Sequence, residues 1–234
     1  MTRPRLLVLV AGTATEVGKT WVGGRTLEHL VSRGVAVAAR KPAQSFDPDD
    51  PAPTDAEVLG AASGEDPTTV CPAHRAYPVA LAPPMAADVL GRPAPMVDDL
   101  VEELRWPDPP AAIGWLETVG GPRSPIAEDA DAVGLADLVE PDVVVLVADA
   151  GLGTINAARL SIDALAGAVP DQDRFVVLLN HFDATDDLHV RTRAYLHDRL
   201  GLRCVTDIER LTDAVLGEPL DEALEDPIGD PLGG

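Results

Sequence analysis

Residues 6–20 read LLVLVAGTATEVGKT, an apolar run followed directly by a loop with a glycine at each end. The run Leu6–Ala11 predicts a strand buried on both faces, because it lacks the polar alternation of a half-exposed strand. Residues 12–20 read G-x-x-x-x-x-G-K-T, which has one more residue between the glycines than the P-loop pattern G-x-x-x-x-G-K-[ST] that it resembles, and a helical pattern over Gly18–Ser32 follows. In this strand–loop–helix order, backbone N–H groups and the helix N-terminus surround a phosphate group. The stretch therefore predicts a site for a nucleoside triphosphate.

The expected phosphate-binding residues are those of the loop and the first helical turn: Gly12, Thr13, Thr15, Glu16, Val17, Gly18, Lys19 and Thr20. In this motif the lysine reaches the β- and γ-phosphates, and the hydroxyl that follows it binds Mg²⁺. Lys19 and Thr20 take these two roles here, so ATP with Mg²⁺ is the expected ligand.

Short apolar runs alternate with helical patterns along the rest of the chain. The expected strands are Val35–Arg40, Ala112–Leu116, Val143–Ala148, Phe175–Leu179 and Leu202–Val205. The expected helices are Asp55–Ala62, Ala86–Leu90, Val97–Leu104, Gly134–Leu138, Thr154–Ala166 and Asp186–Leu200. This alternation predicts an α/β fold with a doubly wound, mainly parallel sheet flanked by helices. Residues 46–53 and 106–110 are expected to be loops, and residues 1–234 one domain with an acidic, Pro- and Gly-rich tail over 217–234.

The charge balance disfavours two classes of partner. Lys and Arg together number 18 against 39 Asp and Glu, which gives a formal net charge of −21. Such a chain repels phosphate backbones and anionic lipids, so neither a nucleic acid nor a membrane is expected as partner. The two cysteines, Cys71 and Cys204, form no C-x-x-C pair, and we expect a cytoplasmic protein that needs no disulfide.

Lysine and asparagine are scarce, and their positions are informative. Lys19 and Lys41 are the only lysines, and Asn156 and Asn180 the only asparagines. Codon bias explains the scarcity but not the positions. The proline after Lys41 turns the chain away from the strand, so Lys41 is expected to point into the crevice above the sheet. It is either a surface cation or a second clamp for an anion, and its pairing with the loop lysine favours the clamp.

A magnesium site in such a fold needs carboxylates near the carboxyl ends of neighbouring strands. Glu117 and Asp149 each follow an expected strand, and Asp55 opens an expected helix. The hydrophobic pattern alone does not choose among these three.

Five segments together resemble the ATP-dependent dethiobiotin synthetases, which are P-loop NTPase-like enzymes of biotin biosynthesis. The segments are GTATEVGKT, KPAQS, YPVALAPPMAA, WLETVGG with its following SP, and VVVLVADAGLGTINAARLSIDAL. They occur in the order and spacing of that family, and the resemblance extends from Leu6 to about Asn180. The last fifty residues match poorly.

The resemblance implies a role for each matching residue. Asp55 and Glu117 would bind the metal with Thr20, which favours Glu117 over Asp149. Lys41, with Ser45 beside it, would hold the carbamate and the transferred phosphoryl group. The substrate would also meet Gly120, Gly121 and Asn156, the last across the interface of a homodimer, and Asn180 would touch the nucleotide base.

The implied reaction is ATP- and Mg²⁺-dependent ring closure of 7,8-diaminononanoate with CO2 to dethiobiotin. It passes through a carbamate and a carbamic–phosphoric anhydride, and Lys41, Lys19 and Ser45 would act at the reacting atoms. Such chemistry requires positioning and charge neutralisation and no covalent nucleophile.

Four positions depart from the family pattern. Ala14 replaces an aspartate in the loop, and Phe46 replaces a glycine after KPAQS. Thr118 and Val119 replace Gly and Ala, where a β-branched residue cannot take a positive φ cheaply. These changes leave open an enzyme of altered substrate, or a regulatory or non-catalytic P-loop ATPase.

Overall fold

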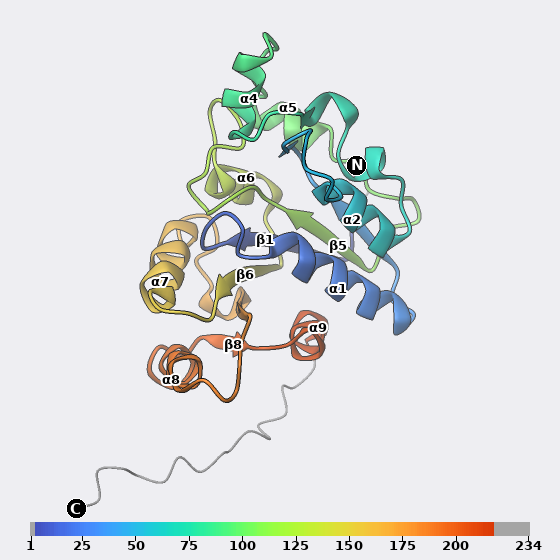
Figure 1. The fold of residues 1–234 in the computed structure, drawn as a ribbon. Coiled ribbons are helices and arrows are strands. Elements are labelled where there is room, and N and C mark those ends of the chain that lie inside the picture. Colours follow the sequence, from blue (N-terminus) through green and yellow to red (C-terminus); the bar gives the residue numbers. More distant parts are fainter. Residues whose placement is uncertain (1–2, 218–234) are drawn as a thin grey trace, which may run out of the picture.

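Six parallel strands form the central sheet of the computed structural model, which describes residues 3–217 (Figure 1). The strand order is β2-β5-β1-β6-β7-β8, and every neighbouring pair is parallel. The strands are β1 (Leu6–Gly12), β2 (Val37–Arg40), β5 (Ile113–Glu117), β6 (Val143–Asp149), β7 (Phe175–Asn180) and β8 (Arg203–Val205). The expected doubly wound α/β fold is therefore confirmed.

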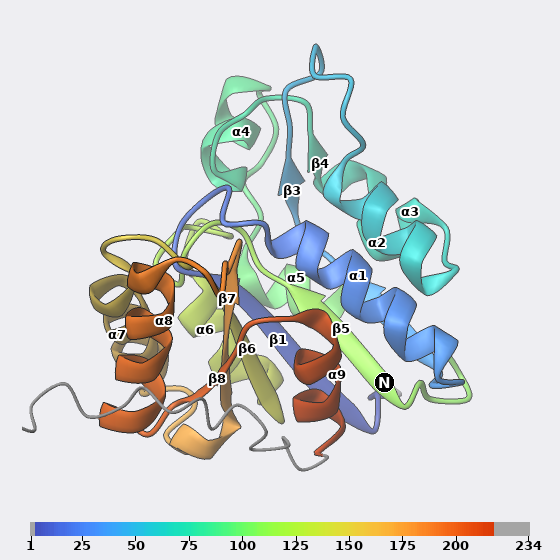
Figure 2. The same cartoon turned by 60° about the horizontal axis from the view of Figure 1, so that its bottom comes forward.

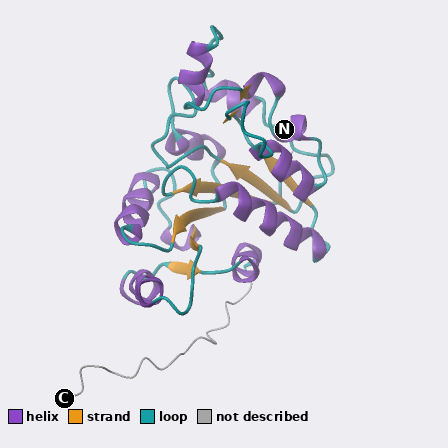
Figure 3. Cartoon of the chain, in the orientation of Figure 1, coloured by secondary structure: helices purple, strands orange, loops and turns teal. Residues whose placement is uncertain are grey.

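Helices enclose the sheet on both faces (Figure 3). They are α1 (Lys19–Ser32), α2 (Asp55–Ser63), α3 (Pro67–Val70), α4 (Pro83–Val89), α5 (Val97–Glu102), α6 (Ala132–Val139), α7 (Thr154–Leu165), α8 (Asp187–Ala194) and α9 (Ile208–Leu216). Short 3₁₀ turns occupy Ala73–Arg75 and Gln172–Arg174. Two short parallel strands, β3 (Gln44–Ser45) and β4 (Ala76–Tyr77), form a separate small sheet.

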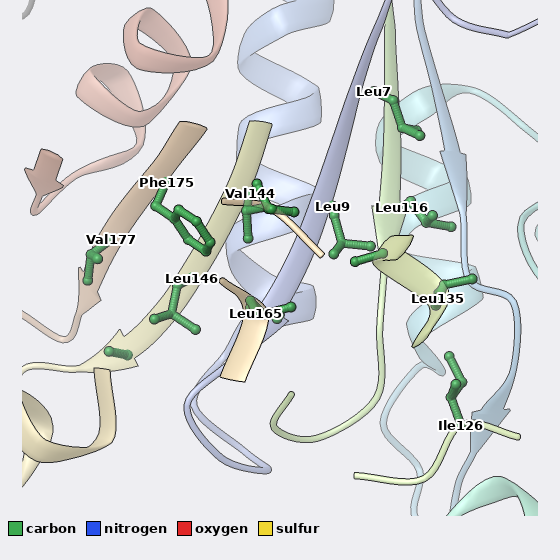
Figure 4. Packing of buried hydrophobic residues seen from close by; sticks show 14 of the residues in the cluster. Leu7, Leu9, Leu116, Ile126, Leu135, Val144, Leu146, Leu165, Phe175 and Val177 are labelled. Atoms are coloured by element: carbon green, nitrogen blue, oxygen red, sulfur yellow. The ribbon is translucent and has the colours of Figure 1, made fainter. Parts of the chain in front are cut away.

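Alternate residues of each central strand enter two different cores. Leu7 and Leu9 of β1 belong to the core beneath α4, α5, α6 and α7, where Phe175 and Leu135 also lie (Figure 4). Val8 belongs to the opposite core, which α1, α2 and α9 cover. Figure 2 shows α1 and α9 on the same face of the sheet. Burial on both sides explains why these strands are apolar at consecutive positions.

Strand β1 lies where the direction of chain winding reverses. Its two neighbours are β5 on one side and β6 on the other, although β2 follows it in the sequence. In open α/β sheets, such a reversal leaves a crevice outside the carboxyl ends of the strands, where ligands bind. The loop after β1 therefore lies at the position where this fold places its site.

Apart from element bounds and the 3₁₀ turns, the observed elements differ from the sequence expectations in four places, and the short helix α3 over Pro67–Val70 is one that was not expected. The helix expected over 186–200 ends at Ala194, and a π-helical turn follows over Tyr195–Arg199. A π-helical turn accommodates one extra residue in the helix, and no particular residue type in the sequence marks it. Helix α9 was not expected, although Asp207 caps its start and Gly217 takes a positive φ at its end. The small sheet β3–β4 was also missed, because two-residue strands carry no periodicity. The expected tail lies, apart from Gly217, outside the described residues.

The two leucines of α6 allow a matched test of this packing. Leu135 is fully buried in the core of Figure 4, whereas Leu138, three residues later, is 46% exposed. We expect Leu135→Ala to lower the free energy of unfolding by about 2–5 kcal/mol, because it leaves a cavity. Leu138→Ala should change it by less than about 0.5 kcal/mol. Urea denaturation of both variants measures the difference, and equal effects would contradict the assignment of the buried face.

Candidate active site

The loop between β1 and α1 has the backbone geometry of a phosphate cradle. Gly18 has a φ of 89° and Glu16 a φ of 62°, and α1 begins at Lys19. A Cβ on Gly18 would collide with the side-chain amide of Asn180, so glycine is required there. Asn180 itself donates from Nδ2 to the carbonyl of Val17 at 3.0 Å. This contact fixes the loop from the end of β7, and the helix N-terminus provides positive potential for an anion.

Lys41 lies at the centre of the site, directly after β2. Its Nζ is 2.7 Å from Asp55 Oδ2 and 2.8 Å from Glu117 Oε1, and it donates to the carbonyl of Thr118 at 3.1 Å. The Lys41 side chain is 2% exposed and that of Glu117 is fully buried. An ammonium group has three hydrogens, and all three are used here.

Thr20 connects this ion pair to the phosphate loop. Its Oγ1 lies 2.6 Å from Asp55 Oδ1 and 2.9 Å from Glu117 Oε1. A hydroxyl has one hydrogen and donates to only one of these carboxylates at a time. The other contact then brings two acceptor oxygens together unless a proton or a cation lies between them.

These donors fit Mg²⁺. The hydroxyl of Thr20 and the carboxylates of Asp55 and Glu117 converge, and Glu117 Oε2 is buried with no hydrogen-bond partner among the described residues. No group of three or more His, Cys, Asp or Glu side chains that could hold a metal occurs within residues 3–217. Mg²⁺ needs no such group, because it is usually held by one or two carboxylates together with substrate phosphates.

Burial and neighbouring charges set the protonation of the cluster. Burial alone would lower the pKa of Lys41, but the carboxylates of Glu117 and Asp55 outweigh it and raise that pKa above its usual range. Burial would raise the pKa of Asp55, and the Lys41 ammonium reverses the direction and lowers it. For Glu117, burial dominates and raises the pKa. Burial and the charge of Lys41 lower the pKa of Lys19. The two lysines therefore act on one another within one site.

A cavity of about 1390 Å³ opens above these residues. Among the expected site residues, its walls include Thr15, Glu16, Gly18, Lys19, Thr20, Lys41, Ser45, Asp55 and Gly120. Phe46 and Val119, two of the departures from the family pattern, also line it. The acidic, proline-rich loop over 46–53 forms part of the wall.

Some expected site residues lie elsewhere in this chain. Asn156 is exposed on α7 and is not part of the cavity wall. Gly121 is also outside the wall, and its N–H donates to Ser124 Oγ at 3.0 Å. Asp149 contacts His181, with Oδ1 3.0 Å from the ring Nδ1, so it is separate from the Thr20 cluster.

The expected backbone strain at Thr118 and Val119 is absent. Neither residue has a positive φ, whereas Gly120 has a φ of 51°. Thr118 is buried, and its Oγ1 donates to the carbonyl of Val10 at 2.9 Å. Its own carbonyl accepts from Lys41. The chain thus needs glycine at position 120 and tolerates β-branched residues at the two positions before it.

Sequence reasoning missed two supporting residues. Gln44 Oε1 accepts from the N–H of Ala56 at 2.9 Å and so fixes the start of α2, where Asp55 lies. Ser124 lines the cavity beside Gly120 and accepts from Gly121. The signal for Gln44 was present, since it lies between Lys41 and Ser45 in KPAQS.

Comparison with known proteins agrees with the resemblance seen in the sequence. A family model described as an AAA domain matches residues 7–214. The ATP-dependent dethiobiotin synthetase of Haloferax mediterranei is 34% identical, over 95% of this chain and 96% of that protein. The synthetase of Corynebacterium efficiens is 29% identical over 92% and 99% of the two chains, and that of Caulobacter vibrioides 34% over 75% and 87%.

Solved structures agree on the fold. The signal recognition particle receptor FtsY of Elizabethkingia anophelis has a TM-score of 0.50 at 16% identity, over 92% of this chain and 65% of that one. Chloroplast FtsY of Physcomitrella patens has a TM-score of 0.50 at 17% identity, over 92% and 66%. In the part of the chain described here, no helix is long and apolar enough to cross a bilayer. The family-model match over residues 7–214 and the relative that is 34% identical over nearly its whole length show that the chain belongs to the ATP-dependent dethiobiotin synthetase family of ligases.

Proposed function

We propose that this chain closes the ureido ring of dethiobiotin from 7,8-diaminononanoate and CO2, using ATP and Mg²⁺. The observation that carries the proposal is one connected cluster: Lys41 contacts Asp55 and Glu117, and both carboxylates contact the hydroxyl of Thr20, the residue after the loop lysine. The cavity is lined by the phosphate loop, both ammonium groups and Asp55, and the buried Glu117 contacts Lys41 and Thr20 behind its wall. Phosphoryl transfer requires this combination of positioning and charge neutralisation.

The ATP phosphates would lie in the loop over 12–18, with Lys19 at the β- and γ-phosphates. Thr20, Asp55 and Glu117 would hold Mg²⁺, and the bound ion would neutralise the phosphate oxygens. Asn180 fixes the loop through Val17, and we infer that its remaining polar atoms face the nucleotide base.

The reaction divides into three steps. One amine of the substrate attacks CO2 and loses a proton, which gives a carbamate. A carbamate oxygen then attacks the γ-phosphorus, the bond to ADP breaks, and a carbamic–phosphoric anhydride forms. The second amine attacks the carbamate carbon, loses its proton and expels phosphate, which closes the ring.

Lys41 would stabilise the second and third steps. Its three hydrogens are committed to Asp55, Glu117 and Thr118. To hold a carbamate or a phosphoryl oxygen, it must therefore exchange at least one of these partners. Ser45 Oγ is buried without a hydrogen-bond partner among the described residues, and it lines the same cavity. It is the group we assign to the carbamate beside Lys41.

We infer that the chain forms a homodimer and that the far end of the substrate is bound at the interface between its two protomers. Asn156 is exposed on α7 and outside the cavity of its own protomer, as a residue that serves a neighbour's site must be. Gly120 and Gly121 would meet the substrate from the same protomer, and Gly121 would have to release Ser124 to donate to it. We also infer a cytoplasmic location, supported by the two buried free cysteines, Cys71 and Cys204.

Product analysis tests the proposed reaction. The protein is incubated with 7,8-diaminononanoate, bicarbonate and Mg-ATP, and the products are identified by mass spectrometry. Dethiobiotin should form with one phosphate released per ring. Phosphate release without dethiobiotin would contradict the proposal.

Replacing Lys41 should separate chemistry from binding. We expect Lys41→Ala to lower kcat roughly 10²–10³-fold, the cost of losing one donor to a developing negative charge. ATP binding should change only a few-fold, because Lys19 and the loop remain. Isothermal calorimetry and steady-state kinetics give the two numbers. Exposed Arg25→Ala on α1 is the control for loss of a positive charge, and an unchanged kcat in Lys41→Ala would refute the role.

Replacing Thr20 tests the metal site. Thr20→Val keeps the shape of the side chain but removes the hydroxyl, so the Mg²⁺ concentration for half-maximal activity should rise roughly tenfold or more. Thr26→Val on the same helix is the matched control, since Thr26 is buried and its hydroxyl donates to the Val22 carbonyl. If both variants shift the Mg²⁺ dependence equally, Thr20 has no metal-specific role.

Mixed dimers test the position of Asn156. Lys41→Ala and Asn156→Ala protomers are each expected to be nearly inactive. If Asn156 serves the partner's site, mixing them creates dimers with one intact site and restores about a quarter of the wild-type activity, since half the dimers are mixed. No recovery after subunit exchange, or a monomer in sedimentation analysis, would exclude the shared site.

A further inference from the structure

Two buried polar atoms beside the metal-binding cluster have no hydrogen-bond partner among the described residues. They are Nε1 of Trp115 and Oε2 of Glu117. Both side chains are fully buried, and the two residues lie two apart on β5. Because side chains two apart on a strand point to the same face, both are directed toward α1. An indole N–H without a partner is a costly feature of a protein interior.

The same backbone position on α1 faces both atoms. A Cβ built on Gly23 would lie 2.8 Å from Trp115 Nε1 and 3.3 Å from Glu117 Oε2. Gly23 is one helical turn beyond Thr20, whose hydroxyl lies 2.9 Å from the other oxygen of Glu117. Each oxygen of this carboxylate thus has its own surroundings. Oε1 faces the charged groups of the site, and Oε2 shares the space beside Gly23 with an indole donor.

We propose that Trp115 is a positioning residue for Glu117. The two atoms face the same space beside Gly23 and are unpaired among the residues that the structure describes, and they pair, with the indole N–H donating to Glu117 Oε2, once Mg²⁺ is bound. Held in this way, the carboxylate keeps Oε1 toward Thr20 and Lys41, where Mg²⁺ would bind. Carboxylates that bind a metal are commonly oriented by such a second hydrogen bond, and its loss costs roughly 10–100-fold in metal affinity or activity.

A purely structural role for Trp115 makes a different prediction. As a core side chain, the indole ring would contribute volume, and its N–H would be irrelevant. Replacing the ring would then change stability through lost packing and leave the Mg²⁺ dependence untouched. Under the proposed role, loss of the N–H weakens the binding of Mg²⁺ and leaves nucleotide binding in the absence of Mg²⁺ unchanged.

Trp115→Phe in the full chain is the test, and Trp106→Phe is its matched control. Trp106 lies outside the cavity, with its ring 5.1 Å from the guanidinium carbon of Arg40. Binding of a non-hydrolysable ATP analogue is measured by calorimetry over a series of Mg²⁺ concentrations. In Trp115→Phe, the Mg²⁺ concentration for half-maximal enhancement should rise roughly tenfold, while affinity without Mg²⁺ stays within twofold of the control. An equal Mg²⁺ dependence in the two variants overturns the proposal, as does an equal loss of affinity with and without Mg²⁺.

A second variant covers the case in which Trp115→Phe does not fold. In a Trp21→Phe, Trp106→Phe background, Trp115 is replaced by benzothienylalanine, which keeps the bicyclic shape and exchanges the N–H for sulfur. The same Mg²⁺ shift relative to the unsubstituted background supports the proposal, and its absence overturns it. The inference rests on the proposed Mg-ATP site, but the measurement needs no ring closure. A failure to make dethiobiotin therefore leaves this test valid.

Discussion

The buried ammonium of Lys41 joins three segments that are distant in the sequence: the end of β2, the start of α2 and the end of β5. It contacts Asp55 and Glu117 at 2.7 and 2.8 Å, and both carboxylates also contact Thr20. Removing such charges from water is expensive, and a buried ion pair often contributes little net stability. The cluster is better explained by ligand binding, because it keeps charged donors and acceptors in place beside the phosphate loop.

The two lysines of a strongly acidic chain lie in one place. The formal net charge is −21, yet Lys19 and Lys41 both line the same cavity. Fixed charges in a cleft with low-dielectric walls concentrate their field there. The neighbouring carboxylates hold Lys41 protonated, whereas burial and Lys41 lower the pKa of Lys19. The two ammonium groups proposed to meet the ATP phosphates thus lie together at the crevice beside β1.

Fewer positions around the site require a positive φ, and therefore glycine, than the glycine-rich family pattern indicates. Gly18 has a positive φ and abuts Asn180, and Gly120 has a positive φ beside Ser124. Thr118 and Val119 have ordinary backbone angles, and Thr118 even contributes a hydroxyl bond to β1 and a carbonyl to Lys41. The substitutions at these two positions therefore preserve the cradle and alter its wall, since Val119 lines the cavity.

The sequence by itself determined the phosphate loop, the roles expected of Lys19 and Thr20, and the parallel sheet, because these follow from local spacing and from apolar runs. The small sheet β3–β4 was missed because its strands are two residues long, whereas helix α9 was missed although its caps, Asp207 and Gly217, and its amphipathic pattern are present in the sequence. Only the tertiary structure brought Asp55 and Glu117 to Thr20 and left Asp149 with His181. The same is true of Trp115 and Glu117 beside Gly23. Which side chains meet depends on strand order and on how closely a helix packs, and neither is encoded in the spacing of neighbouring residues.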